Sequence, residues 1–194
     1  MMRKVIIDDI LGSASYEIVR QDFRRRIIEL KKKRRVSIGN KVSLLFENRD
    51  TVIFQIQEML RVERISDLDK IREEIAIYNQ LIPDSRELSA TLFIEIEDQA
   101  HLREELVRFQ GIEEALTLHI SGRRHPARFE LGRSNEDKIS AVQYVRFSFD
   151  DQALDDFVSG ARTELVIEHR NYQAAVMLKP ETQRSLAEDL SRNL

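Results

Sequence analysis

The spacing of apolar residues changes near residue 85, and this change limits the folds open to the chain. Before residue 85, apolar side chains recur at three- and four-residue steps, the period of one face of an α-helix. After it they alternate with polar residues, as in "ATLFIEIE" over residues 90–97, which is the period of a half-buried strand. The 194-residue chain is therefore predicted to be an α+β protein, with a helical N-terminal half packed on a half rich in antiparallel sheet.

Helices are predicted over residues 15–34 and 51–65, with a third beginning near residue 66. In the first, Phe23, Ile27 and Leu30 lie on one stripe and are expected to anchor it to the body of the protein. Between the first two helices, Gly39-Asn40 indicates a turn between two strands. A two-residue turn would not segregate the apolar side chains, so we expect either a longer turn or an irregular pairing.

Two segments of the second half share one order of predicted elements, strand–helix–strand–strand. The joints between first strand and helix read "IEIEDQA" and "FSFDDQA", with Asp98 and Asp151 as the expected helix N-caps. This pattern predicts a duplicated β-α-β-β unit, followed by a closing helix. We expect residues 1–85 to form a helical subdomain with a β-hairpin and residues 86–194 a mixed sheet subdomain, together making one compact domain.

Positive charge is concentrated in one short segment. Residues 20–35 contain nine cations and two carboxylates, a net of +7, which leaves 22 cations and 32 carboxylates elsewhere, a net of −10. Two interpretations stay open: a solvated outer face on a packed helix, or an anion or nucleic-acid site. The residues of that candidate anion site are Arg24, Arg25, Lys31, Lys32, Lys33 and Arg34.

Several chemistries lack their sequence signatures. The chain has no cysteine, no glycine-rich phosphate loop, no G-x-S-x-G elbow and no H-E-x-x-H or E-x-x-H motif. We therefore expect no metal and no cofactor. No run of apolar residues has the length of a membrane span, and two aspartates interrupt the N-terminal apolar run, so a cytoplasmic protein without a membrane partner is expected.

A few polar residues are candidates for ligand binding. His169 and Tyr172 are expected to meet across a hairpin, where they would either bind a ligand or fix the turn. The second predicted helix adds polar side chains to the set. The candidate ligand-binding residues are Glu58, Arg61, Arg64, His169 and Tyr172.

The segment "LLFENRDTVIFQIQEMLRVERI", with "YNQLIPD" and "SAVQYVRFSF", resembles an uncharacterised bacterial family catalogued as domain of unknown function 3501. The resemblance covers nearly the whole chain and implies no catalytic activity or site residue. It implies that members of the family are encoded near iron–sulfur oxidoreductases and rubrerythrin-like proteins, and so an association with them.

The expected function is a non-catalytic accessory or binding protein with a protein partner, in an iron–sulfur or oxidative-stress redox system. One alternative is nucleic-acid or anion binding through the basic helix. Another is an enzyme with a site near Arg61, Arg64 or His169. The sequence leaves the oligomeric state open.

Overall fold

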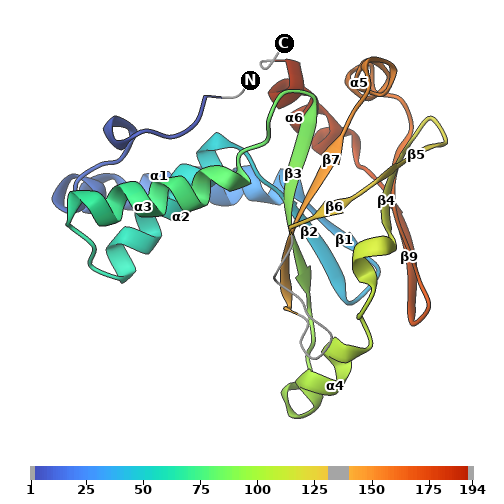
Figure 1. Ribbon diagram of the computed structural model, residues 1–194. Coiled ribbons are helices and arrows are strands. Elements are labelled where there is room, and N and C mark those ends of the chain that lie inside the picture. The colour runs from blue at the N-terminus through green and yellow to red at the C-terminus, as the bar shows by residue number, and fades with distance from the viewer. Residues whose placement is uncertain (1–2, 131–139, 192–194) are drawn as a thin grey trace.

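The computed structural model describes residues 3–130 and 140–191, and it confirms the α+β class (Figure 1). Three long helices lie together on one side of the strands. They are α1 (Ser13–Arg34), α2 (Arg49–Val62) and α3 (Leu68–Tyr78), all close to the predicted ranges.

The strands in these two ranges form two antiparallel sheets. The five-stranded sheet has the order β1 (Arg35–Ile38), β2 (Val42–Phe46), β3 (Glu87–Ile94), β7 (Val142–Ser148) and β6 (Arg128–Phe129). The four-stranded sheet has the order β5 (Arg123–Pro126), β4 (Leu116–Ile120), β8 (Thr163–His169) and β9 (Tyr172–Met177).

Shorter helices and turns connect these elements. Helix α4 (Leu102–Val107) lies near the far end of the sheets in Figure 1, and α5 (Asp151–Val158) and α6 (Pro180–Ser191) lie at the opposite end. The 3-10 turns are η1 (Ile7–Asp9), η2 (Asn79–Leu81), η3 (Gln99–His101) and η4 (Ile112–Glu114).

The main core lies between the two sheets. Alternate residues of β3 and β7, such as Leu92 and Val145, meet inward-facing residues of β4 and β8, such as Leu118 and Leu165. The opposite face of the five-stranded sheet faces the helices, where a second core of α2, α3 and the N-terminal segment forms around Ile56. One sheet with both faces covered therefore joins the helical half to the strand-rich half.

The five-stranded sheet contains strands from both sides of the division expected at residue 85. Strand β2 pairs with β3 in antiparallel register, with Leu44 opposite Leu92, so one sheet crosses the division. The hairpin of the N-terminal half is thus part of the sheet of the C-terminal half.

The repeated order β-α-β-β occurs as predicted. Strand β3 pairs with β7, and β4 with β8, so the corresponding first and second strands of the two units lie side by side. The helices differ, because α5 buries Ala153, Leu154 and Phe157 whereas no residue of α4 is buried. Asp98 caps η3 as expected, but the second cap is Asp150 and not Asp151. Both positions are aspartates, so the sequence pattern alone could not choose between them.

Helix α1 is anchored through its apolar stripe, as predicted. Ile27 is buried, and Phe23 packs edge-on against Tyr16 and Phe54 at ring-centroid distances of 6.2 and 5.7 Å. Leu30 is half-buried. The cation-dense segment is therefore a fixed wall of the folded protein.

Arg34, the last residue of α1, was predicted to be part of an anion-binding site, but it is buried inside the protein. Its side chain is 1% exposed and pairs with Asp189 of α6 at 2.7 Å. Its guanidinium also donates to the carbonyls of Phe46 at 2.9 Å and Glu47 at 3.1 Å. A buried charge needs such partners, so this cation is used inside the protein. The helical period of the sequence predicts which side of α1 is apolar. It does not predict that α6, far along the chain, covers the C-terminal end of α1.

The turn between β1 and β2 is held by Tyr172. Ile38 pairs with Val42, which leaves a three-residue loop and confirms the longer turn. The Tyr172 hydroxyl donates to the Ile38 carbonyl at 2.6 Å and accepts from the Lys41 N–H at 3.1 Å. Gly39, with φ of +70°, lies so close that a Cβ added there would overlap with that hydroxyl oxygen.

Replacing Gly39 by alanine tests this contact. Gly122 is the matched control, because it also has a positive φ but a Cβ added there would have no atom within 4 Å. Gly122→Ala is expected to lower the free energy of unfolding by about 1 kcal/mol for the left-handed backbone alone. Gly39→Ala is expected to cost clearly more, as measured by urea denaturation. Equal losses in the two variants would contradict the Tyr172 contact.

Arg34→Met tests the buried ion pair. It leaves Asp189 buried without its partner, and the free energy of unfolding is expected to fall by about 3–5 kcal/mol. Lys33→Met, at the exposed neighbouring position, is expected to change it by no more than about 0.5 kcal/mol. The double variant Arg34→Met/Asp189→Leu should recover part of the loss. If both the Lys33→Met and Arg34→Met variants lose similarly little free energy of unfolding, the buried Arg34–Asp189 ion pair is refuted.

Candidate functional site

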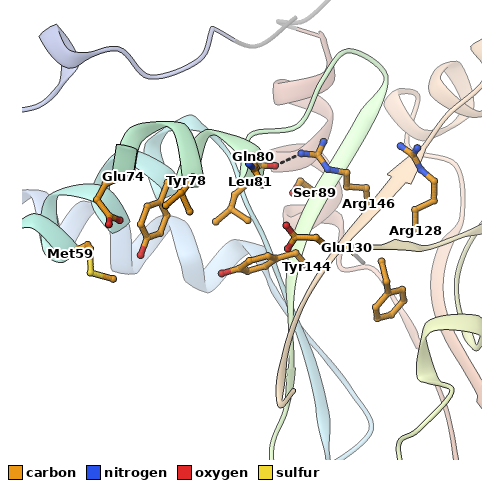
Figure 2. Close-up of a pocket in the computed structure, with 12 residues that line it drawn as sticks. Met59, Glu74, Tyr78, Gln80, Leu81, Ser89, Arg128, Glu130, Tyr144 and Arg146 are labelled. Carbon is orange, nitrogen blue, oxygen red and sulfur yellow. Dashed lines mark hydrogen bonds between the residues drawn. The ribbon is translucent and has the colours of Figure 1, made fainter. Parts of the chain in front are cut away.

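A cavity of about 540 Å³ lies between helix α3 and the β7–β6 side of the five-stranded sheet (Figure 2). Small-molecule sites typically have volumes of about 300–1,000 Å³. Glu74 and Tyr78 project from α3, and Tyr144 reaches the cavity from β7. The remaining lining residues are Met59, Ile77, Gln80, Leu81, Ser89, Arg128, Phe129, Glu130 and Arg146.

One end of this cavity combines aromatic rings with a carboxylate. Glu74 and Tyr78 are four residues apart and so share a face of α3. Tyr144 lies on the face of β7 opposite Val145, and so points away from the main core toward the helices. Burial raises the pKa of Tyr78, and the neighbouring Tyr144 and Glu74 raise it further. The Tyr78 phenol therefore stays neutral near pH 7.

The other end of the cavity contains two arginines that are already paired within the protein. The carboxylate of Glu87 is 7% exposed and accepts from Arg128 at 2.5 Å and from Arg146. Arg146 also donates to the Gln80 carbonyl, as Figure 2 shows. Much of the positive charge at this end is thus balanced by a buried carboxylate.

The sequence did not identify this cavity. Glu74 and Tyr78 carry a usable signal, their common helix face, and the alternation of β7 places Tyr144 opposite the main core. Neither pattern indicates that α3 packs beside β7. That contact arises because the chain, after forming β4 and β5, comes back to pair β7 with β3.

Glu58 and Arg61, predicted as ligand-binding residues, lie together on α2 at a different place. Arg20 donates to both Glu58 carboxylate oxygens, at 2.7 and 2.9 Å, and the Tyr16 hydroxyl donates to one of them at 2.8 Å. The Arg20 guanidinium and the Tyr16 hydroxyl hold the pKa of Glu58 at about 2. Arg61 borders a second cavity, of about 340 Å³, beside α1 and α3.

Arg64 and His169 lie apart from these cavities. Arg64 is exposed, with a φ of 53° just after the end of α2. His169 lies opposite Tyr172 in the β8–β9 hairpin, as expected, and is 5% exposed. A shallow depression lies beside it.

Both ring nitrogens of His169 are used by the backbone. Nε2 lies 2.9 Å from the Gln110 carbonyl, and Nδ1 lies 3.3 Å from the Asn171 N–H. A carbonyl only accepts and an N–H only donates, so the contacts fit the neutral tautomer with the proton on Nε2. With the Tyr172 hydroxyl held at the β1–β2 turn, these contacts favour a structural role for both residues.

Four of the other five candidate anion-binding residues lie on the exposed surface of α1, and the fifth, Lys31, faces α2. Arg24, Arg25, Lys32 and Lys33 are exposed. Arg25 pairs with Asp22, and Lys32 pairs with Glu29 at 2.6 Å. The Lys31 ammonium lies 5.5 Å above the ring of Phe54.

Two further findings concern residues 3–130 and 140–191 only. No group of three or more histidine, aspartate or glutamate side chains there is arranged to hold a metal ion. No helix in those ranges is both long enough and apolar enough to cross a membrane.

The comparisons with known proteins agree with the resemblance in the sequence. A family model described as "Protein of unknown function (DUF3501)" matches residues 4–190. The crystal structure of a novel protein of unknown function from Burkholderia pseudomallei is similar to this chain, with 36% sequence identity and a TM-score of 0.91, over 97% of this chain and 100% of that one. No curated protein matches the chain. Because the family model spans most of the chain, this protein belongs to the DUF3501 family.

Proposed function

We propose that this protein binds a small organic cation in the cavity between α3 and β7, without transforming it chemically. The observation that carries the proposal is the half-buried Glu74 carboxylate beside Tyr78, for which no ion pair is found within residues 3–130 and 140–191. Tyr144 lies further along the cavity, next to Glu130 (Figure 2). A half-buried carboxylate is stabilised by a nearby cation, and tyrosine rings attract cations to their faces.

The charge distribution favours a cation over an anion. Arg128 and Arg146 both bind Glu87, so an incoming anion would compete with a buried carboxylate that is already in place. At the Glu74 end, a cation meets no such competitor. Met59, Ile77 and Leu81 supply an apolar wall for the carbon part of the ligand.

A binding role fits the protonation of Tyr78 better than a catalytic role. A tyrosine acting as a general base needs a pKa near the working pH. Burial raises the pKa of Tyr78 instead, which keeps the hydroxyl protonated and the ring neutral. A neutral ring is suited to holding a cation by its face.

The test uses choline and its neutral carbon isostere as probes, titrated by calorimetry. Choline is expected to bind more tightly than the isostere, and Glu74→Gln should weaken choline binding about tenfold, or about 1.4 kcal/mol. Glu73→Gln, at the exposed adjacent position of α3, is the matched control and should leave binding unchanged. Equal binding of the two probes, or equal effects at positions 73 and 74, would overturn the proposal.

An accessory role beside an iron–sulfur or oxidative-stress redox system is the wider context that we propose for this binding. Its support is the resemblance to a family that implies that association. A protein that binds a ligand without transforming it would act there through a protein partner.

Anion or nucleic-acid binding by α1 is a second candidate, favoured by the exposure of Arg24, Arg25, Lys32 and Lys33 along one helix. Measurement of duplex DNA binding at increasing salt tests it, because each phosphate contact steepens the loss of affinity. Substitution of Arg24, Lys32 and Lys33 by glutamine should weaken binding and reduce the salt slope. Absence of binding to wild-type protein at low salt would rule out this candidate.

A further inference from the structure

The cavity beside Arg61 differs in chemistry from the Glu74 cavity. It lies between the N-terminal segment and helices α1, α2 and α3, and has a volume of about 340 Å³. Most of its wall is aliphatic, which suits a hydrocarbon chain better than a polar ligand. The aliphatic residues are Ile7, Ile10, Leu11, Leu60, Ile65, Leu68 and Ile71.

The wall on the N-terminal side is fixed to α2. The Leu11 N–H donates to the Gln57 side-chain oxygen at 2.7 Å, and the Gln57 amide donates back to the Leu11 carbonyl at 3.1 Å. Gln57 is buried, so these two bonds are shielded from water. The cavity is thus bounded by held backbone on this side.

Arg61 brings a positive charge with spare hydrogen-bonding capacity to this aliphatic wall. Its Nε is buried and has no hydrogen-bond partner within the described residues. Its closest carboxylate oxygens, on Glu58 and Glu17, are 3.5 and 3.9 Å from its terminal nitrogens. Good N–H···O bonds span about 2.7–3.2 Å, so both contacts are long.

The reason that Glu58 does not satisfy Arg61 is its commitment to Arg20. The shorter bonds of Arg20, at 2.7 and 2.9 Å, use both carboxylate oxygens. Glu17 is half-exposed, so its attraction for Arg61 is screened by water. Burial raises the pKa of Tyr16, with Glu58 adding to the effect, so this phenol at the cavity brings no negative charge.

We propose that this cavity binds an aliphatic carboxylate, such as a free medium-chain fatty acid. The chain lies against the isoleucine and leucine wall, and the carboxylate accepts hydrogen bonds from the two terminal nitrogens of Arg61, whose contacts inside the protein are long. A planar guanidinium offers these two donors in a fork that matches the two oxygens of a carboxylate. The terminal nitrogens have only carboxylate contacts of 3.5 and 3.9 Å inside the protein, and this ligand supplies a closer acceptor.

Decanoate is the probe, titrated calorimetrically against the full chain below the concentration at which decanoate forms micelles. Decanol, which has the same chain but a neutral head group, serves as the ligand control, and acetate lacks the chain. Decanoate is expected to bind saturably with one site, at least tenfold more tightly than decanol, while acetate gives no measurable heat of binding.

Variants then locate the site. Arg61→Gln should weaken decanoate binding at least tenfold and leave decanol binding unchanged. Arg72→Gln, at an exposed arginine of α3 that pairs with Asp69, is the matched control and should bind as the wild type. If Arg61→Gln proves unfolded by its thermal transition, Arg61→Lys keeps the charge, loses the fork, and should give an intermediate affinity.

Three results would overturn the inference. They are no saturable decanoate binding, equal binding of decanoate and decanol, and wild-type affinity in the position-61 variant. None of them bears on the choline experiment, because Glu74 and Arg61 border different cavities.

Discussion

The burial of the Arg34 guanidinium is the constraint on which the arrangement of the helices and strands depends. The side chain ends α1, binds two carbonyls at the end of β2 and pairs with Asp189 of α6. A charge removed from water needs all of these partners at once, so the three elements cannot move independently without exposing an unpaired group. The carboxylate of Glu47 continues this network, accepting from Thr51 of α2 at 2.5 Å and from Thr91 of β3 at 2.7 Å.

This network has a consequence for the candidate sites. It fixes α2 against the five-stranded sheet, and α3 packs on α2, so α3 comes to lie beside β7. The N-terminal segment is then tied to the end of α3, since Val5 and Asn79 exchange two hydrogen bonds of 2.8 and 2.9 Å. The first cavity therefore forms where the helical half meets the five-stranded sheet, the second forms within the helical half, and neither belongs to a single element.

The two cavities carry opposite charge for the same physical reason. In each, a network inside the protein uses up one sign of charge and leaves the other facing the cavity. Glu87 binds the arginines beside the first cavity, and Arg20 binds Glu58 beside the second. Carboxylates, among them Glu74, remain at the first cavity, and the Arg61 guanidinium remains at the second, and each lies against an apolar wall where it can orient a ligand.

The sequence by itself determined the type and order of the elements. The α1 stripe, the longer turn at Gly39 and the repeated β-α-β-β order follow from side-chain period and turn chemistry, which act over a few residues. Only the tertiary structure decided that Arg34 is internal while Lys33 is exposed, and that Glu74, Tyr78 and Tyr144 share a cavity. Those outcomes depend on which distant segment covers a given surface, and on which of several nearby opposite charges makes the short contact. Local periodicity carries no information about either, because both are set by packing and desolvation between elements far apart in the chain.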